Sequence, residues 1–335
     1  MTAYARSVIH DGDDLLRLES AWWDLWRRPP GATPFQSPAW LLSWWKVFHP
    51  GTLATVAIHD HERLVALAPL YLENGTRGLR LLPVGIALSD YLDALVDPTH
   101  PGAVEAILET IEADINWGSC SFEELAPGSA LLAHFPRRSL NDTTMRQSAC
   151  PVLTLPDSVE DLGECVPARK LRKLRMARNR AARRKGFSIE TVDPPATKAF
   201  LDELFRLHGA RWRQQGETGV LDEDHVRSFH ESAAPALARA GLARMMLVSL
   251  EGRIAGAYYG FSHRGKAFAY LGGFDPEFAF ESPGTILMGQ AVEAAIAEGC
   301  CEFHFLRGRE PYKYEWGAID RWSLRRTLTR EAVHA

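Results

Sequence analysis

Two stretches of the sequence, far apart in the chain, carry the same pattern. Ala57–Leu72 and Leu247–Ser262 both read as a strand, a short polar turn, an arginine and a second strand. The pattern predicts a β-hairpin in each half of the chain. Single cores tend to split beyond about 250–300 residues, and this chain has 335. The repeat therefore favours two domains of similar size and a duplicated fold.

Each half alternates predicted strands with predicted helices. In the first half, Ser37 and Pro38 mark a helix start, because serine caps helices and proline suits the first helical position. The segments expected to be helices are 13–26, 37–48, 101–113, 196–214, 223–240 and 285–298, and the main strands are 53–59, 64–72, 79–84, 187–192, 244–250, 254–262, 266–272 and 301–306. This order predicts an α+β class, with mixed, mostly antiparallel sheets flanked by helices.

Composition and cysteine spacing exclude several classes of protein. With 46% hydrophobic and 24% charged residues, the chain is expected to be globular. Its five cysteines follow no zinc-binding or disulfide pattern, which favours a reducing compartment. No apolar run approaches the roughly 18 residues of a membrane span, and the first residues lack an apolar leader segment. We therefore expect a cytoplasmic protein without a membrane span.

A basic segment lies between the two halves. Ala168–Lys185 contains ten lysines or arginines and no acidic residue, although the whole chain has a net charge of −4. Leu171, Leu174 and Ala177 have helical spacing, and Gly186 follows where a helix would end. One interpretation is a surface helix whose cations pair with an acidic body. The other is a site for a polyanion such as RNA, a phosphosugar, a lipid head group or nucleotide phosphates. No aromatic residue interrupts the charges, so we expect only weak binding of unpaired RNA.

The most informative segment is Ala269–Ala318. It reads as a strand ending at Gly272 and Gly273, an irregular loop, and a helix from Thr285. Backbone N–H groups of Gly284 and Thr285 are expected to be unpaired at the helix start, where an anion such as pyrophosphate can bind. Gly284 lacks a Cβ, so phosphate oxygens can approach its backbone closely. The alternative is an ordinary helix start after a loop.

Several longer motifs resemble one known family. They are LFRLHGARWRQQGETGVL (Leu204–Leu221), YLGGFDPEFAFESPGTILMGQAVEAAIAEG (Tyr270–Gly299), FLRGREPYKYEWGA (Phe305–Ala318) and, more loosely, FQSPAWLLSWW (Phe35–Trp45) and LSDYLDALVD (Leu88–Asp97). They are similar to the CelD-like branch of the GNAT acyltransferases, which are relatives of the tandem-GNAT FemAB transferases. The resemblance implies two tandem GNAT-like domains, 1–165 and 187–335, joined by a basic linker helix at 166–186. It also implies that the second domain is the catalytic one.

The resemblance also implies an acyl-CoA site. Ser282, Gly284 and Thr285 would hold the phosphates, and strands 266–272 and 301–306 would separate to admit the pantetheine arm. The co-substrate would be acetyl-CoA or another acyl-CoA, and no metal is expected. His304 stands where related sequences more often have an aspartate.

Acyl transfer needs a base for the acceptor, an oxyanion donor and a proton source for the departing thiolate. Glu310 and His304 are candidate bases, and Tyr312 and Tyr314 are candidate proton donors. Arg307 and Lys313 are candidates for holding an anionic acceptor. Further candidates are the catalytic Asp275 and the acceptor-side residues His208, Arg211, Tyr314 and Trp316.

Each of these candidates also has a structural interpretation. The alternatives are an ion-pair network for Arg307, Glu310 and Lys313, core packing for His208 and His304, and a turn for Asp275. Likewise, Asp90, Tyr91 and Asp93 are either an acceptor-facing loop or capping residues.

The expected function is transfer of an acyl group from acyl-CoA to an amine or hydroxyl of a sugar, a sugar nucleotide or a small amine in polysaccharide or envelope synthesis. The donor follows from the resemblance and the predicted anion site, and the acceptor from the resemblance alone. Expected partners are the small-molecule acceptor and polysaccharide-synthesis proteins, and nucleic acid is not expected. Two alternatives stay open: a FemAB-like transferase that uses aminoacyl-tRNA, and a non-catalytic GNAT-fold assembly protein of a polysaccharide synthase.

Overall fold

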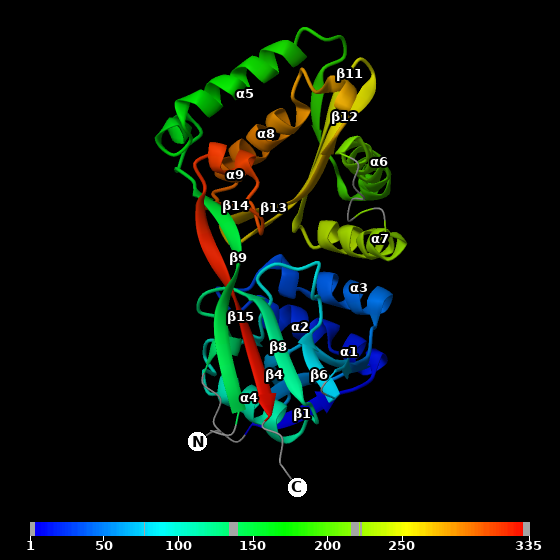
Figure 1. The fold of residues 1–335 in the computed structure, drawn as a ribbon, viewed down its shortest axis with the longest axis vertical. Helices are drawn as coiled ribbons and strands as arrows, with labels where there is room; N and C mark the ends of the chain where they lie inside the picture. The colour runs from blue at the N-terminus through cyan, green and yellow to red at the C-terminus, as the bar shows by residue number, and fades with distance from the viewer. Residues whose placement is uncertain (1–3, 77, 134–139, 216–220, 222, 331–335) are drawn as a thin grey trace. The chain divides into compact units, whose positions relative to one another are not determined.

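The computed structural model describes residues 4–76, 78–133, 140–215, 221 and 223–330 (Figure 1). It divides into two compact units: unit 1 comprises residues 1–148 and 322–335, and unit 2 comprises residues 149–321. The boundaries fall within two long strands, β9 (Leu140–Thr154) and β15 (Ile319–Arg330). Both boundaries differ from the division expected from the sequence, since the last strand returns the chain to unit 1.

Unit 1 contains two sets of paired β-strands and several α-helices. Its elements are α1 (Gly12–Arg17), α2 (Glu19–Trp26), α3 (Pro38–Phe48) and α4 (Ala103–Ala113), with β1 (Ala5–Ile9), β2 (Thr52–Leu53), β3 (Thr55–Asp60), β4 (Arg63–Ala68), β5 (Leu70–Gly75), β6 (Gly78–Pro83), β7 (Leu95–Val96) and β8 (Ser119–Leu125). One sheet has the order β1-β3-β4-β7 and is antiparallel. In the other, β5 and β6 are antiparallel, whereas β6 and β8 are parallel.

Two predicted elements of unit 1 are divided. The strand expected at 64–72 is two strands, β4 and β5, which belong to different sheets on either side of Pro69. Proline has no N–H to donate to a ladder, so it suits the point where the chain changes sheets. The helix expected at 13–26 is also two helices that meet at Leu18, whose N–H donates to the Leu15 carbonyl (3.2 Å) in a tightened last turn. Ser37 caps α3 with Pro38 at its first position, as predicted.

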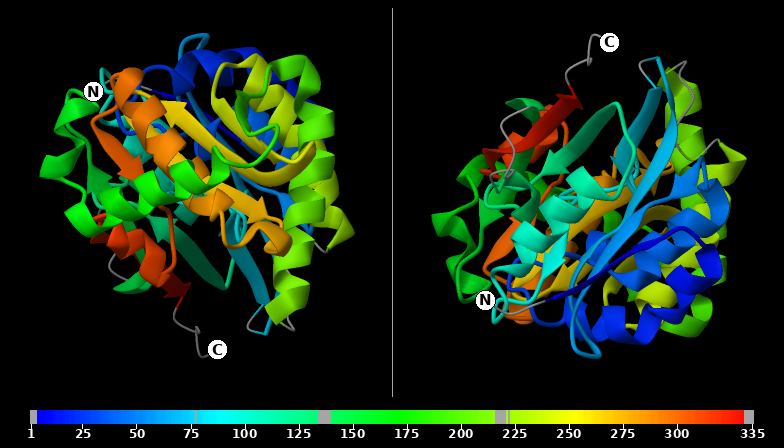
Figure 2. Two further views of the ribbon diagram at one scale, coloured as in Figure 1. Left: turned by 90° about the horizontal axis from the view of Figure 1, so that it is seen from above. Right: turned by 90° about the horizontal axis from the view of Figure 1, so that it is seen from below.

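Unit 2 is a single twisted sheet with helices on both faces. Its helices are α5 (Ala168–Ala181), α6 (Thr197–Gln215), α7 (Asp224–Arg239), α8 (Pro283–Ala297) and α9 (Pro311–Glu315), and its strands are β10 (Ser188–Thr191), β11 (Ala243–Leu250), β12 (Arg253–His263), β13 (Lys266–Phe274) and β14 (Glu302–His304). The strand order is β10-β11-β12-β13-β14-β9, antiparallel except for the parallel pair β13 and β14. Helix α8 packs on one face with α5 outside it, and α6 and α7 cover the other face (Figures 1 and 2). The α+β prediction is confirmed.

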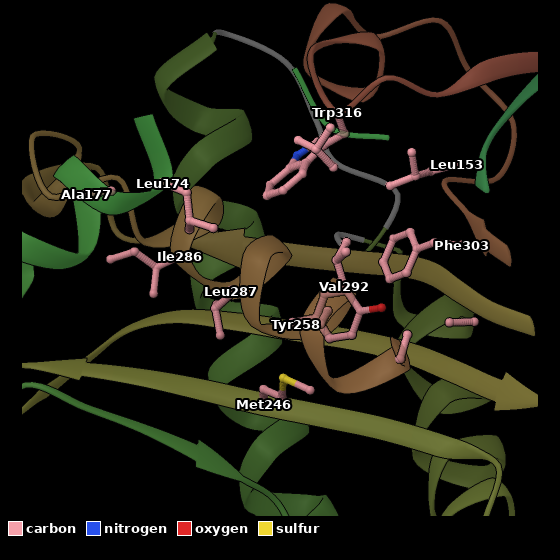
Figure 3. Packing of buried hydrophobic residues seen from close by; sticks show 14 of the residues in the cluster. Leu153, Leu174, Ala177, Met246, Tyr258, Ile286, Leu287, Val292, Phe303 and Trp316 are labelled. Atoms are coloured by element: carbon pink, nitrogen blue, oxygen red, sulfur yellow. The ribbon is translucent and has the colours of Figure 1, made fainter. Parts of the chain in front are cut away.

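The basic helix α5 is part of the core of unit 2. Its apolar side chains Leu174 and Ala177 are buried against α8 and its neighbours (Figure 3), and Ala181 belongs to the same buried cluster. Leu174 lies over Gly289, where an added Cβ would sit 2.5 Å from a Leu174 methyl group. Only glycine permits this close approach of the two helices. The segment expected to be a linker is therefore a packed layer of unit 2.

The two segments with the repeated sequence pattern form matching hairpins. In β3–β4 the turn lies between paired Asp60 and Arg63, and in β11–β12 it lies between paired Leu250 and Arg253. His61 and Glu251, the first turn residues, both have φ near 53°. The sequence repeat is therefore a structural repeat.

Among the helices that the structure describes, none is long and apolar enough to cross a membrane. All five cysteines lie among the described residues, and none of them forms a disulfide bond.

Candidate active site

Strands β13 and β14 separate partway along their length. They pair from Lys266–Glu302 to Phe268–His304, where β14 ends while β13 continues to Phe274. Just beyond the last pair, the register between β12 and β13 shifts, so that Tyr270 is the extra residue of a β-bulge. A β-bulge bends the strand and changes the direction in which its side chains point. The predicted separation of these two strands is present in the structure.

A cavity of about 390 Å³ lies beside the free part of β13. Its wall includes residues 269–274 of β13, the start of α8, Tyr312 of α9, Trp316 just after that helix, and Lys170 of α5. Lys170 is the one charged side chain among the described lining residues; its Nζ lies 3.1 Å from Glu315 and 4.8 Å from the centroid of the Trp316 ring. The cavity is thus mostly apolar, and its volume falls within the range of small-molecule sites.

The start of α8 borders this cavity. Ser282 adopts a left-handed conformation (φ 57°), and its hydroxyl makes no capping bond to α8. The Thr285 N–H donates to the Ser282 carbonyl (3.0 Å), so the prediction that it is unpaired is wrong. The Gly284 N–H has no acceptor among the residues described, and Gly284 is exposed. An added Cβ there would make only an ordinary 3.5 Å contact with Phe274, so larger branches would extend into the cavity.

Arg180 of α5 supplies a positive charge at the start of α8. Its Nη2 donates to the Ser282 hydroxyl (3.3 Å), and its guanidinium lies 4.9 Å from the centroid of the Phe280 ring. No carboxylate in the described part of the chain pairs with it, and its Nε is buried without a partner. A helix amino terminus with an uncompensated cation favours an anion. The sequence drew attention to the basic segment but not to this residue.

Three other cations of α5 pair with acidic residues. Arg178 forms a two-point ion pair with Glu293 (2.8 and 2.6 Å), and Lys170 and Lys173 both bind Glu315. Beyond the helix, Arg184 bridges Glu251 and Glu281. The interpretation of this segment as a helix that pairs with acidic residues is confirmed for these side chains.

Lys313 and Glu310 hold the loop that follows β14. The buried Lys313 ammonium donates to the carbonyl oxygens of Leu306, Arg307 and Gly308 (3.2, 2.8 and 3.2 Å) and lies 2.9 Å from Glu310. The Glu310 carboxylate folds back over Gly308, where an added Cβ would lie 2.6 Å from it. Neither residue lines the cavity. Their observed contacts match the structural interpretation, an ion-pair network at a strand end.

Of the two candidate proton donors, only Tyr312 lines the cavity. Tyr314, on the same short helix, donates its hydroxyl to Asp320 (2.6 Å) and accepts from Arg309 (3.3 Å). The Asp320 hydrogen bond and burial raise the pKa of Tyr314. The structure therefore places Tyr312 and Trp316, but not Tyr314, with the phosphate-site candidates.

His304 lies at the last paired position before the strands separate. Neighbouring Phe303 and Phe305 belong to the core beneath α8, so His304 faces the side covered by α6 and α7. Its Nε2 lies 3.0 Å from Glu302, which also accepts from Arg321 (2.6 Å). Burial lowers the pKa of His304, although Glu302 opposes this, and hydrogen bonds from His304 and Arg321 lower the pKa of Glu302. The result is a neutral imidazole oriented by a carboxylate.

Asp275 lies outside the cavity. Its carboxylate accepts from the Glu277 N–H (3.0 Å) and pairs with Arg253 (2.8 Å) in a second, exposed hollow of about 530 Å³. This matches the interpretation of Asp275 as a turn residue.

The remaining acceptor-side candidates are not gathered at the cavity either. His208 is buried on α6, whose backbone packs directly on Gly273 of β13. Arg307 lies in the loop held by Lys313 and does not line the cavity. The side chain of Arg211 lies outside the described residues.

The three candidates in unit 1 have structural contacts of their own. The Asp93 carboxylate accepts from the Ser129 hydroxyl (2.6 Å) and from the N–H groups of Ala130 and Leu131. Burial raises the pKa of Asp93 to about 6, although these hydrogen bonds lower the pKa of the same carboxyl group. The Tyr91 carbonyl accepts from Gln36 (2.8 Å), and Asp90 is buried. For Asp93, the observed contacts match the capping interpretation.

Residues 168–314 match a family model described as an acetyltransferase (GNAT) domain. The match covers the anion-site candidates, the separating strands and Tyr312. Unit 2 therefore carries a GNAT acetyltransferase domain, and the chain is an acyltransferase. No curated protein sequence matches this chain.

Solved structures resemble the chain over nearly its whole length. FemX is 11% identical with a TM-score of 0.66, covering 96% of each chain. A protein of unknown function from Bacteroides thetaiotaomicron is 12% identical with a TM-score of 0.62, covering 96% of this chain and all of that one. The C-terminal domain of a protein from Agrobacterium fabrum, named as a lysylphosphatidylglycerol synthetase, is 13% identical with a TM-score of 0.58, covering 95% and 92%. At these identities the likeness shows a shared fold.

Proposed function

We propose that the chain transfers an acyl group from acyl-CoA to an amine or hydroxyl of a sugar, a sugar nucleotide or a small amine, in the synthesis of polysaccharide or cell envelope. One observation carries the proposal: within a GNAT domain, β13 and β14 separate beside an apolar cavity that ends at the start of α8. The CelD-like branch is part of this proposal. Because the expected donor is made in the cytoplasm, we also place the enzyme there.

The residues around the cavity fit the parts of CoA. The Gly284 N–H, the Ser282 hydroxyl and the Arg180 guanidinium form a polar end suited to phosphate. The apolar wall from Ala269 to Phe274 suits the pantetheine arm. Tyr312 lines the same space, so its hydroxyl can reach a thiolate that leaves there.

We assign the proton transfers to two residues. His304 receives the proton of the acceptor, because its buried imidazole is neutral and Glu302 orients it. The acceptor nitrogen or oxygen then bonds to the acyl carbon, and the bond from that carbon to sulfur breaks. Tyr312 donates a proton to the thiolate and then takes up a proton from solvent. His304 releases to solvent the proton that it received from the acceptor. Backbone N–H groups of the bulged segment around Tyr270 are candidates for stabilising the oxyanion.

The acceptor class rests on the resemblance and on the names of two structural neighbours. One is FemX, and the other is named for the synthesis of lysylphosphatidylglycerol, a lipid. The likeness to FemX also favours the second candidate function, transfer from aminoacyl-tRNA. Binding of the donor separates the two, because the proposed enzyme binds CoA at Gly284 and the alternative binds charged tRNA. A non-catalytic assembly protein would bind neither.

The test is thermal stabilisation by CoA and acetyl-CoA. A ligand that binds only the folded state adds about 2.7 kcal/mol at one hundred times its dissociation constant. Gly284→Val should abolish this gain, because the side chain would extend into the cavity. Gly102→Val, at the corresponding start of α4 in unit 1, is the control and should keep it. A wild type that shows no shift at millimolar CoA would remove the basis of the proposal.

A further inference from the structure

Three arginines on the outward face of α5, and a fourth just beyond its end, have no acidic partner among the described residues. Arg169, Arg172, Arg175 and Arg183, here called the arginine face, are all exposed. Met176, with 52% of its surface exposed, and Asn179 lie among them. Among the ion pairs of the described residues, none involves these four arginines. The charge of this face is therefore uncompensated.

The arginine face differs from the rest of the same segment. Lys170, Lys173 and Arg178 pair with Glu315 and Glu293, and the helix is anchored in the core by Leu174 and its neighbours. The fold thus does not use the four outward arginines, whose mutual repulsion opposes folding. A concentrated positive face of this kind attracts an acidic partner and accelerates its association.

The position of α5 relates the arginine face to the donor cavity. At one end of the helix, Lys170 lines the cavity. At the other end, Arg180 binds Ser282 at the start of α8, and Phe280 beside it is 70% exposed. The helix also lies on the α8 side of the sheet (Figure 2). By contrast, His304 faces the side covered by α6 and α7. A partner bound to α5 would therefore approach the donor cavity from outside.

The residue types favour a protein as the partner. Interfaces between proteins are enriched in arginine, methionine and aromatic residues and depleted in lysine. Here the four arginines, Met176 and Phe280 are exposed, whereas both lysines of α5 pair with Glu315, although Lys173 is itself exposed. The helix itself has no aromatic residue on which unpaired bases could stack. A lipid surface carries no acyl thioester, so it would not explain why the helix that carries this face also borders the donor cavity through Lys170.

We propose that the arginine face docks an acidic carrier protein that presents its acyl group on a phosphopantetheine arm. The arm would enter the cavity as the pantetheine of CoA does, with its single phosphate at Gly284 and Arg180. In the reaction, the bond between the acyl carbon and the carrier thiol breaks and a bond to the acceptor forms. The acceptor proton is transferred through His304, and the carrier thiolate is protonated by Tyr312. The inference rests on the proposed function for its thioester chemistry.

The test measures binding to the full chain and needs no acceptor. Fluorescently labelled acyl carrier protein, in its holo form and in the apo form without the arm, is titrated by anisotropy at low and at physiological salt. The test variant is Arg172→Gln with Arg175→Gln. The matched control is Lys198→Gln with Arg239→Gln, which removes two exposed, unpaired cations from α6 and α7 on the other side of the sheet. CoA-induced thermal shifts of both variants report whether the cavity is intact.

We expect holo carrier protein to bind more tightly than the apo form and to bind less tightly as salt rises. The test variant should weaken binding roughly tenfold or more, the control should change it by less than about twofold, and both should keep the CoA shift. Absence of carrier binding, or equal loss in both variants, would overturn the inference. So would variant-sensitive binding of tRNA or phosphatidylglycerol vesicles without such binding of the carrier. A CoA shift without carrier binding rejects this inference alone, whereas the absence of both rejects the proposed function as well.

Discussion

The two units share a framework but differ at one connection. Each contains a β-hairpin with a two-residue turn. Further along the chain, each also contains two parallel strands joined by a helix: β6, α4 and β8 in unit 1, and β13, α8 and β14 in unit 2. In unit 1 the connection from the first parallel strand to the helix is residues 84–102, whereas in unit 2 it is only 275–282. The hairpin and the parallel pair are thus common to both units, and this connection is where they diverge.

The long connection of unit 1 is fixed by its own polar groups. Asp93 caps residues 129–131, and Asp97 accepts from Thr99 and pairs with Arg28 and Arg63. In unit 2 the short connection ends at Ser282, whose hydroxyl leaves α8 uncapped beside a cavity. The comparison teaches that both units keep the same framework, while in unit 2 a short loop leads directly to the start of α8, where Gly284 lines a cavity.

The largest effect is expected from Tyr312→Phe, which should lower turnover about 100- to 10,000-fold, because the variant lacks the hydroxyl that we propose protonates the leaving thiolate. The CoA shift should remain. Tyr314→Phe, whose hydroxyl bonds Asp320 outside the cavity, and Tyr71→Phe in unit 1 should retain turnover. Steady-state rates with acetyl-CoA and the true acceptor provide the measurement. If Tyr312→Phe kept full activity and Tyr314→Phe lost activity, Tyr314 rather than Tyr312 would be the proton donor.

Lys313→Met should destabilise the protein by about 3 kcal/mol, since three carbonyl groups of the loop, one buried and two partly buried, lose their donor. Urea unfolding measures the loss, and Lys198→Met on the exposed face of α6 should change stability by less than about 0.5 kcal/mol. Unchanged stability combined with a raised KM for an anionic acceptor would instead make Lys313 a binding residue, contrary to its observed contacts.

Asp97 makes an acid-dependent prediction for unit 1. Burial acts to raise its pKa, but hydrogen bonds from Thr99 and Arg28 outweigh it and lower the pKa to about 2. Because the pKa is lower in the folded state than its ordinary 3.8, the contribution is present above about pH 4 and is lost as the pH falls towards 2. It amounts to about 2 kcal/mol. Denaturant unfolding of wild type and Asp97→Asn at several pH values should show their difference shrinking over this window; a constant difference would contradict the prediction.

The smallest effects are expected at the two hairpin turns. His61→Gly and Glu251→Gly should each stabilise by up to about 1 kcal/mol, because a left-handed conformation is strained for side chains other than glycine. The gain at Glu251 should be the smaller one, since the exposed pair with Arg184 is lost. Glu62→Gly, at a residue without positive φ, serves as the control and should not stabilise. Thermal unfolding that ranks the two turns in the opposite order would weaken the likeness between the hairpins.

Much of the fold could be predicted from local sequence. The start of α3 was predictable because the Ser37 and Pro38 signals act on groups within one turn. Both hairpins and the start of α8 were predictable for the same reason. Predicted bounds were less accurate at Pro69, where a continuous apolar run conceals a change of sheet.

The site was predicted only in part. Ser282, Gly284, Tyr312 and Trp316 line one cavity. Arg180 was not singled out, because ten neighbouring cations look alike in the sequence and only packing decides which of them meets Ser282. Lys313 and Glu310 were candidates for chemistry, yet their contacts are with the loop beside them.

The sequence alone determined the features that depend on neighbours along the chain: the helix starts, the hairpins and the concentration of charge in one helix. Tertiary structure decided that β15 returns to unit 1, that α5 packs on Gly289, and that Glu302 orients His304. It also decided which cations of α5 are neutralised, since their partners Glu293 and Glu315 lie more than a hundred residues away. Burial and charge pairing depend on three-dimensional packing. A pattern of residue types therefore predicts which segments carry reactive or charged side chains, but not which of these side chains stay unpaired in the folded protein.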